Sequence, residues 1–263
     1  MLIIKNKPIG VFDSGLGGLS ILRELRRFLP HENYIFLADQ AYVPYGDKTP
    51  VELIDRCLKV GEFLKNQNVK LMVVACNTAT CYALEALRRE FAVPIVGTVP
   101  AVKPAAERTK TNIIGIISTE ATSKSKTLAD LIEVYASDKK IINIGCAGLE
   151  HAVEAGELDS PRTSDLLLSY LEPIKNSLAD CLVLGCTHYP FLKPAITKVM
   201  EREIEIIDSG IAIAKRVKTL LTNDSAENQV GTVEYFTTGD PNQFNDIASK
   251  LLKKNIETQI IQL

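Results

Sequence analysis

Two short segments of similar composition contain the residues best suited to chemistry. Cys76-Asn-Thr78 and Cys186-Thr-His188 each follow an apolar run. A cysteine at the start of a helix feels the positive end of the helix dipole, which favours its thiolate. His188 is close enough to Cys186 to act as an acid, a base or a partner of the thiolate. Either cysteine alone would be explained as a small buried residue, but their matching contexts favour a shared catalytic role.

A glycine-rich segment, Asp13-Ser-Gly-Leu-Gly-Gly18, follows the first apolar run and opens a helical pattern. Its glycines allow a tight turn, and the free N–H groups at a helix start suit an anion. The segment lacks the Lys-Ser/Thr of a P-loop and the spacing of a dinucleotide fingerprint, which argues against a nucleotide. The same N–H groups would hold a carboxylate.

Other polar residues leave two interpretations open. Pro44-Tyr45-Gly46 is either a rigid surface turn or the aromatic wall of a pocket. Thr119, Thr122 and Ser125 either cap the next helix or contact a ligand beyond a strand end. The remaining cysteines lack the context of Cys76 and Cys186, and the remaining histidines share no motif with a candidate nucleophile. We expect the cysteines to pack in the core and the histidines to lie on the surface or in helices: Cys57, Cys81, Cys146 and Cys181; His31 and His151.

Short apolar runs alternate with amphipathic segments along the whole chain, which predicts βαβ units around mostly parallel sheets. The expected strands are Ile9–Asp13, Tyr34–Ala38, Lys70–Ala75, Ile113–Ile117, Ile141–Ile144, Cys181–Gly185, Ile204–Asp208 and Val233–Phe236. The expected helices are Leu19–Phe28, Val51–Leu64, Ala79–Phe91, Leu128–Tyr135, Arg162–Asn176 and Ile211–Leu221. In such sheets, ligands bind beyond the carboxyl ends of the strands, where the polar segments above are expected.

Two internal similarities suggest a duplication. Val73–Thr78 resembles Val183–His188, and Val11–Gly15 resembles Ile206–Gly210. The fold predicted is therefore α/β, with two pseudo-symmetric, doubly wound lobes and an active site in the cleft between them. We expect residues 1–98 with 209–263 to form the first lobe and residues 99–208 the second. Cys76 and Cys186 would then face one small ligand from opposite sides, an arrangement that suits removal of a proton on one face of a carbon and its return on the other.

Composition excludes several classes of protein. The chain has 263 residues, 46% of them hydrophobic, with 30 Lys and Arg against 32 Asp and Glu. A net charge of −2 gives no electrostatic sign of binding to nucleic acid or to an anionic membrane. Residues 1–8 do not resemble a signal peptide, and no apolar run is long enough to span a membrane. We therefore expect a cytoplasmic protein whose six cysteines are thiols, with no metal site.

Four motifs together resemble glutamate racemase of the cofactor-independent aspartate/glutamate racemase superfamily. They are Asp13-Ser-Gly-Leu-Gly-Gly18, Pro44-Tyr-Gly46, Ala75-Cys-Asn-Thr-Ala79 and Gly185-Cys-Thr-His-Tyr-Pro190. The resemblance runs from about residue 8 to about residue 210 in consistent order. It implies interconversion of L- and D-glutamate by two cysteines without pyridoxal phosphate or metal, a homodimer, and a supply of D-glutamate for peptidoglycan and so for cell shape.

The resemblance also implies roles for individual residues. Cys76, assisted by Asp13, would take the α-proton of D-glutamate. Cys186, assisted by His188 and Glu154, would take that of L-glutamate. The residues implied in substrate binding are Asp13, Ser14, Tyr45, Gly46, Asn77, Thr78, Thr119, Thr122, Thr187 and His188. Preorganised donors among them would stabilise the charge that develops when this weakly acidic proton leaves.

The chain departs from the family pattern at two places. Ser118 stands where the family usually has glycine, and the segment around Glu150 and Glu154 matches loosely, so either glutamate could be the partner of His188. We expect Glu150 to be an exposed helical residue and favour Glu154. The alternatives are an aspartate racemase or a related decarboxylase, a hydrolase using Cys186 and His188, and a protein that only binds a small anion. A decarboxylase needs one acidic cysteine and the hydrolase leaves Cys76 without a role.

Overall fold

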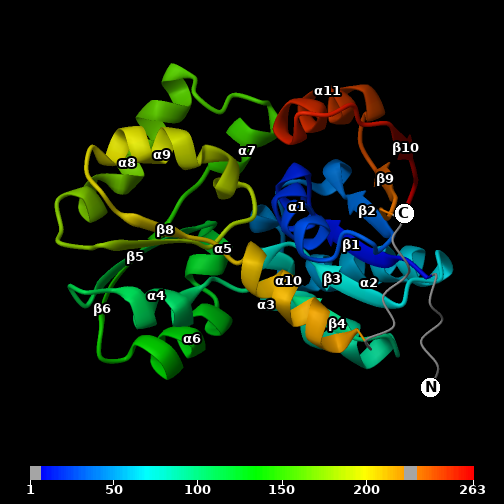
Figure 1. Ribbon diagram of the computed structural model, residues 1–263, viewed down its shortest axis with the longest axis horizontal. Coiled ribbons are helices and arrows are strands. Elements are labelled where there is room, and N and C mark those ends of the chain that lie inside the picture. Colours follow the sequence, from blue (N-terminus) through cyan, green and yellow to red (C-terminus); the bar gives the residue numbers. More distant parts are fainter. Residues whose placement is uncertain (1–6, 222–229) are drawn as a thin grey trace. The chain divides into compact units, whose positions relative to one another are not determined.

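The computed structural model describes residues 7–221 and 230–263, and the chain divides into two compact units. Unit 1 comprises residues 1–98 and 210–263, and unit 2 comprises residues 99–209. Each unit is a parallel sheet with helices on both faces, as Figure 1 shows. The α/β class with two doubly wound sheets is thus confirmed. The expectation for the N-terminal segment concerns mainly residues 1–6, which lie outside the described residues.

Unit 1 has a six-stranded sheet in the order β10-β9-β2-β1-β3-β4, and every neighbouring pair is parallel. Its strands are β1 (Ile9–Asp13), β2 (Tyr34–Ala38), β3 (Leu71–Val74), β4 (Ile95–Gly97), β9 (Val233–Thr237) and β10 (Thr258–Ile260). Its helices are α1 (Leu19–Phe28), α2 (Pro50–Asn66), α3 (Asn77–Glu90), α10 (Gly210–Leu220) and α11 (Pro241–Leu252).

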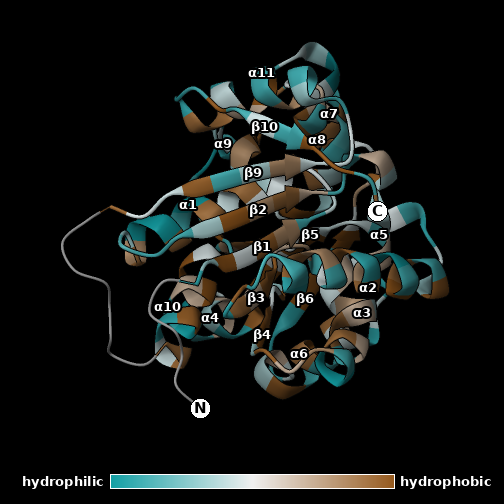
Figure 2. Ribbon diagram, turned by 90° about the vertical axis from the view of Figure 1, so that its right-hand side faces the viewer, coloured by the Kyte–Doolittle hydropathy of each residue, from teal (hydrophilic) through white to brown (hydrophobic). Residues whose placement is uncertain are grey.

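The two faces of this sheet have separate apolar cores. Phe12 and Leu37 point to one face, where they join the core formed with α2 and α3. Phe36 points to the other face and contacts Phe244 of α11, with ring centroids 6.4 Å apart. Figure 2 shows hydrophobic residues along β1 and β2 and hydrophilic residues on the outer side of α11. Burial on both faces explains why these strands read as continuous apolar runs in the sequence.

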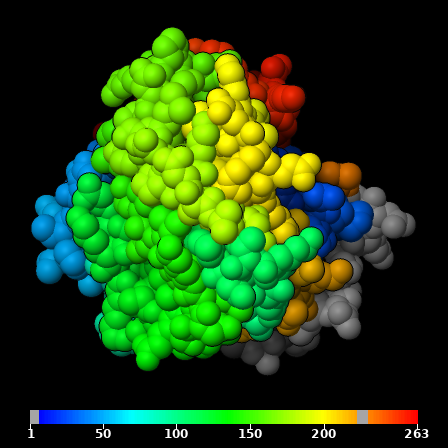
Figure 3. Space-filling model, turned by 90° about the vertical axis from the view of Figure 1, so that its left-hand side faces the viewer, coloured from blue at the N-terminus to red at the C-terminus, as the bar shows by residue number. Residues whose placement is uncertain are grey.

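Unit 2 has a four-stranded parallel sheet in the order β6-β5-β7-β8. Its strands are β5 (Ile113–Ser118), β6 (Lys140–Gly145), β7 (Cys181–Leu184) and β8 (Glu205–Ile207). Its helices are α4 (Val102–Arg108), α5 (Glu120–Ser123), α6 (Lys126–Ala136), α7 (Leu149–Glu154), α8 (Pro161–Lys175) and α9 (Lys193–Met200). Figure 3 shows the surface of this unit in green to yellow.

The strand order supports one of the two internal similarities and corrects the other. The order β2-β1-β3-β4 in unit 1 is repeated by β6-β5-β7-β8 in unit 2, so β3 and β7 occupy equivalent places. The segments Cys76–Thr78 and Cys186–His188 follow these two strands. In contrast, Val11–Gly15 belongs to β1 inside its sheet, whereas Ile206–Gly210 belongs to the edge strand β8. The second similarity is therefore not part of the repeat.

Most expected elements are confirmed with boundaries shifted by a residue or two, and the missed strands are short. The strands β4 and β10 have three residues each, too few to show a pattern. In the described part of the chain, no helix is long and apolar enough to cross a membrane.

Candidate active site

The Asp13 carboxylate is held at the end of β1 by the glycine-rich turn. Asp13 is fully buried, and its Oδ2 accepts a hydrogen bond of 2.6 Å from the N–H of Gly18. A Cβ atom at residue 18 would lie only 2.6 Å from the Cβ of Asp13. Glycine is therefore required for this close approach, and the motif uses its N–H to fix its own carboxylate.

Cys76 follows β3 and is the N-cap of α3. Its Sγ accepts a hydrogen bond of 3.5 Å from the N–H of Ala79, and lies 3.9 Å from the hydroxyl oxygen of Ser14. The backbone thus stabilises negative charge on this sulfur, because the N–H and the helix dipole both point toward it. The next residue, Asn77, is buried and donates from its side chain to the main-chain oxygen of Thr98 at 3.3 Å.

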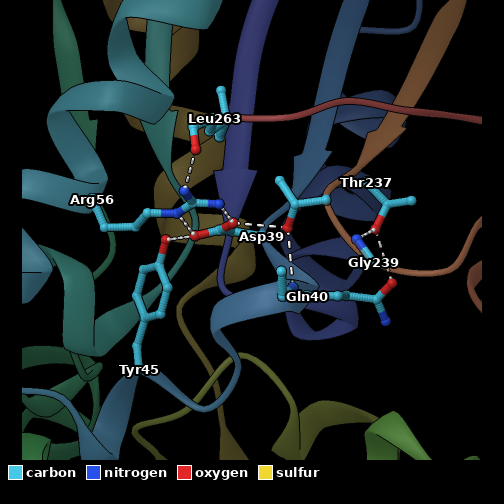
Figure 4. Close-up of polar contacts among 9 residues, drawn as sticks. Asp39, Gln40, Tyr45, Arg56, Thr237, Gly239 and Leu263 are labelled. Carbon is cyan, nitrogen blue, oxygen red and sulfur yellow. Dashed lines mark hydrogen bonds and ion pairs between the residues drawn. The ribbon is translucent and has the colours of Figure 1, made fainter.

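Tyr45 is buried in the core of unit 1, and Figure 4 shows the polar network around it. Its hydroxyl donates to Oδ2 of Asp39 at 2.7 Å. Asp39 is fully buried, and both of its carboxylate oxygens accept hydrogen bonds from the guanidinium of Arg56, at 2.8 and 2.5 Å. Arg56 also donates to the main-chain oxygen of Leu263 at 3.0 Å. Burial, followed by the neighbouring Cys57 and Asp39, raises the pKa of Tyr45, so its hydroxyl remains a donor.

This network determines how the Pro44–Gly46 segment is held. Thr238 donates a further hydrogen bond of 2.8 Å to Asp39, whose own N–H donates to the main-chain oxygen of Asp13 at 2.9 Å. The segment is therefore braced against the end of β1 rather than forming a free surface turn. Because the Tyr45 hydroxyl already donates a hydrogen bond to Asp39, its role is structural. Gly46 is partly exposed.

Cys186, His188 and Glu154 form a continuous chain of acid–base groups in unit 2. The Cys186 sulfur lies 3.6 Å from Nδ1 of His188, and Nε2 of His188 lies 2.7 Å from Oε1 of Glu154. All three residues are buried. Because a carboxylate only accepts, Nε2 carries a proton, and Nδ1 is left to exchange one with the thiol.

The charges along this chain oppose the effect of burial. Burial raises the pKa of Cys186, and the hydrogen bond and charge of His188 act in the opposite direction. Burial also lowers the pKa of His188, but contacts with Cys186 and Glu154 outweigh it, and the pKa of the imidazole rises well above its ordinary value. Glu154 thus favours the imidazolium, which in turn favours the Cys186 thiolate.

Glu150 lies in the same helix, and its predicted exposure is wrong. It is only 7% exposed. It lies in the first turn of α7, and its Oε1 accepts a hydrogen bond of 3.3 Å from the N–H of Gly148. Its negative charge contributes to the raised pKa of Cys186. Of the two glutamates, the structure brings Glu154 to His188.

Thr119 and Thr122 lie beyond the end of β5. Thr119 is the N-cap of α5 and accepts from the N–H of Thr122 at 3.2 Å, so its hydroxyl has a capping function. The serine that departs from the family pattern, Ser118, fits because its neighbour is Gly185, the residue that follows β7. A Cβ on Gly185 would lie 2.9 Å from the Cβ of Ser118.

The remaining candidates are placed as follows. Thr78 lies in the first turn of α3, and Thr187 lies between Cys186 and His188; both are buried. All six cysteines are free thiols. Cys57, Cys146 and Cys181 are buried, as expected, whereas Cys81 is half-buried on α3. Within the described ranges, no group of three or more His, Cys, Asp or Glu side chains could hold a metal ion.

Two residues that the sequence did not single out, Asp39 and Arg56, organise the Tyr45 segment. Arg56 lies on the buried side of α2 with Leu53, Cys57 and Val60. A lone cation among the apolar positions of a helix indicates a buried ion pair. That signal was present in the sequence pattern.

Comparison with known proteins gives one consistent family. The family model for Asp/Glu/hydantoin racemases matches residues 10–217. A glutamate racemase of Pseudomonas syringae pv. tomato is 42% identical over 243 residues, which cover 91% of this chain and 88% of the relative. The chain belongs to the Asp/Glu/hydantoin racemase family, and within it to the glutamate racemases. It is therefore an amino-acid racemase.

Solved structures of this family agree with the fold. Glutamate racemase isoform RacE1 from Bacillus anthracis superimposes with a TM-score of 0.89 at 32% identity, covering 99% of both chains. Escherichia coli glutamate racemase, solved with L-glutamate and the activator UDP-MurNAc-Ala, gives a TM-score of 0.86 at 32% identity, covering 97% of both chains. The predicted family and fold class are confirmed.

Proposed function

We propose that this racemase interconverts L- and D-glutamate with two acid–base thiols: one of Cys76 and Cys186 removes the α-proton, and the other donates a proton to the opposite face of the α-carbon. The observation that carries the proposal is the Cys186–His188–Glu154 chain, a buried thiol with a proton acceptor in contact and a carboxylate behind it. Cys76 follows the equivalent strand of the other unit, and its sulfur accepts a hydrogen bond from the N–H of Ala79 in the first turn of α3. The relatives support glutamate as the substrate, because the curated proteins at about 40% identity are glutamate racemases.

The reaction balances with one thiolate and one thiol. The Cys186 thiolate takes the α-proton of L-glutamate, and the electron pair of the broken C–H bond moves into the α-carboxylate. The Cys76 thiol then donates its proton to the opposite face of the α-carbon and becomes the thiolate. The reverse direction begins from that thiolate and D-glutamate. The two sulfurs must therefore reach opposite faces of one carbon.

Each thiol has a different assistant. Asp13 assists on the side of Cys76, where the N–H of Ala79 and the dipole of α3 favour the thiolate. His188 assists Cys186 directly, and Glu154 holds the imidazole in orientation. Substrate binding falls to the polar groups beyond the strand ends. Asn77, Thr78, Thr187 and His188 are the closest of them in sequence to the thiols, and the Ser14 hydroxyl lies 3.9 Å from the Cys76 sulfur. Gly46, Thr119 and Thr122 complete the set, and Tyr45 contributes through the segment that it anchors.

The chemistry uses two thiols and an imidazole, which supply an acid and a base without pyridoxal phosphate or metal. Both thiols must stay reduced, which supports a reducing compartment such as the cytoplasm. By its family, the enzyme would act as a homodimer and supply D-glutamate to peptidoglycan.

The test is incubation of the purified, metal-free protein with L-glutamate in D₂O, without pyridoxal phosphate, followed by chiral chromatography and proton NMR. We expect D-glutamate labelled with deuterium at the α-carbon, and loss of this product in Cys76→Ala and Cys186→Ala. Cys81→Ala is the matched control, because it removes a thiol from α3 outside the proposed site. Inert L- and D-glutamate with a folded, reduced wild-type protein would refute the proposal, and turnover of aspartate instead would reassign the substrate.

A further inference from the structure

A cavity of about 450 Å³ in unit 1 has a lining that is strongly positive. Among the described residues, five cationic side chains line it, together with a tyrosine and three leucines but no aspartate or glutamate. We call this cavity the basic groove. Its lining residues are Leu22, Arg23, Arg26, Arg27, Tyr235, Leu251, Leu252, Lys253 and Lys254.

The basic groove lies at the edge of the sheet opposite to the catalytic residues. Arg26 is in the last turn of α1, and Lys253 directly follows α11. Helices that connect parallel strands end where the next strand begins, so these C-termini lie at the amino ends of the strands. Asp13 and Cys76 lie at the carboxyl ends, about 16 Å away along a five-residue strand. A ligand in the groove would therefore not touch the reacting atoms.

The charges in the basic groove are not balanced. Arg23 and Arg27 share one carboxylate, that of Glu24, at 3.6 and 3.7 Å. Across the described ranges, Arg26 and the two lysines have no carboxylate within ion-pair distance. The C-termini of two helices together supply about one negative charge. Within the described residues, five cations against about two negative charges leave a surplus of about three.

Another cavity shows that this imbalance is not general. A cavity of about 820 Å³ in unit 2 also contains three cations, but four carboxylates line it as well. One of its cations, Arg108, is paired with Glu205 at 2.7 Å. In the basic groove, by contrast, Arg26, Lys253 and Lys254 have no such pair among the described residues.

Tyr235 is an independent sign of a ligand in the basic groove. It is only 5% exposed, and its hydroxyl has no hydrogen-bond partner in the part of the chain that is described. Burial raises the pKa of Tyr235, so the hydroxyl stays protonated and is a hydrogen-bond donor in the lining of the groove. Beside it, desolvation, followed by the charge of Arg26, lowers the pKa of Lys254. An anion would satisfy the hydroxyl and stabilise both cations.

We propose that the basic groove binds a small molecule that carries a diphosphate or two phosphate groups. Guanidinium groups match phosphate oxygens in pairs, and a surplus of about three positive charges matches the charge of a diphosphate. The volume is that of a small-molecule site. A long nucleic acid is disfavoured, because the surplus is confined to one cavity of a chain with net charge −2.

Calorimetric titration with inorganic pyrophosphate tests the proposal on the full chain. We expect one site per chain, weaker binding of orthophosphate and sulfate, and an affinity lowered at least about 10-fold by Arg26→Gln. Tyr235→Phe keeps the ring and removes only the hydroxyl, and should weaken binding by about five-fold. Lys218→Gln is the control with the same change of charge on an exposed part of α10, and should change affinity less than two-fold. Equal losses for Arg26→Gln and Lys218→Gln, or no binding of pyrophosphate, would overturn the proposal.

A melting experiment without ligand separates binding from a structural role. If the cations await an anion, Arg26→Gln relieves repulsion and the Tm stays the same or rises. If they only stabilise helix ends, the Tm falls and pyrophosphate affinity does not change, and the proposal is wrong. A DNA duplex that binds and is not displaced by pyrophosphate would also refute it. Basal racemisation should be unchanged in all three variants, so the outcome is independent of the proposed function.

Discussion

The two thiol sites occupy equivalent places in their units but stabilise a thiolate by different means. At Cys76 the stabilising groups belong to the backbone, namely the N–H of Ala79 and the dipole of α3. At Cys186 they are side chains, because His188 contacts the sulfur and Glu154 contacts His188. Backbone groups cannot titrate, whereas an imidazole and a carboxylate can. In the proposed mechanism, the thiolate would thus be stabilised once by fixed dipoles and once by groups that respond to pH.

The difference extends to how each site is supported. The Cys76 side is braced by Asp39 and Arg56, a buried ion pair that also holds the N-terminal strand through the N–H of Asp39. At Cys186, the buried ionisable pair is His188 and Glu154, which belong to the acid–base chain itself. Mutations of Asp39 or Arg56 should therefore affect mainly stability, and mutations of His188 or Glu154 mainly chemistry.

Replacing either thiol should have the largest effect. We expect racemisation to fall by at least about 10³-fold in Cys186→Ala, because the second acid–base group is lost. The remaining Cys76 would still remove and return the α-proton of D-glutamate on one face, so D-glutamate should exchange its α-hydrogen with D₂O without inversion. Cys76→Ala should show this exchange only for L-glutamate. Proton NMR in D₂O measures both, and exchange of both enantiomers by one variant would contradict the assignment.

Removing the cation of the buried ion pair should have the largest effect on stability. Arg56→Met leaves the Asp39 carboxylate buried without its partner, which costs about 3–5 kcal/mol of the free energy of unfolding. Urea denaturation followed by circular dichroism measures this loss. The double variant Arg56→Met/Asp39→Asn removes the unpaired charge and should recover part of it. A double variant less stable than Arg56→Met would show that the charge is not the cause.

His188→Asn should lower kcat/KM by about 10²-fold, the usual contribution of one acid–base group. The two directions must fall by the same factor, because the equilibrium constant between enantiomers is one. The sides can still be distinguished with substrates deuterated at the α-carbon. Slower transfer at Cys186 should increase the isotope effect on kcat/KM for L-glutamate and decrease it for D-glutamate. An isotope effect that increases for D-glutamate instead would show that His188 assists Cys76 and not Cys186.

The sequence was sufficient for the fold class and for the place of Cys76 and Cys186 beyond strand ends, because each depends on local patterns. Continuous apolar runs identify strands buried on both faces, and a cysteine followed by polar residues identifies the helix start beyond β3. Short strands such as β4 were not predicted, because three residues are too few to show a periodic pattern of hydrophobicity. The pairing of β8 at the sheet edge also escaped, since an isolated similarity of sequence says nothing about strand order.

Tertiary contacts determined what the sequence left open. Glu150 and Glu154 are four residues apart on one helix and look equivalent, yet only the packing of α7 decides which reaches His188. Tyr45 is in a recognisable motif, but its hydroxyl is bonded to Asp39, which no local pattern indicates. Burial of a polar side chain depends on elements distant in the chain, so its role could not be inferred from its neighbours.

The two glutamates of α7 provide the subtlest comparison, because their effects on Cys186 have opposite signs. Glu154 favours the imidazolium of His188, which lowers the pKa of the Cys186 thiol, so Glu154→Gln should raise that pKa. Glu150 contributes a negative charge that raises it, so Glu150→Gln should lower it. The pKa of the Cys186 thiol can be measured by titrating the absorbance of its thiolate in a Cys76→Ala background. We expect this pKa to rise by about one pH unit in Glu154→Gln and to fall by less in Glu150→Gln. Shifts of the same sign would mean that the imidazole does not transmit the charge of Glu154 to the sulfur.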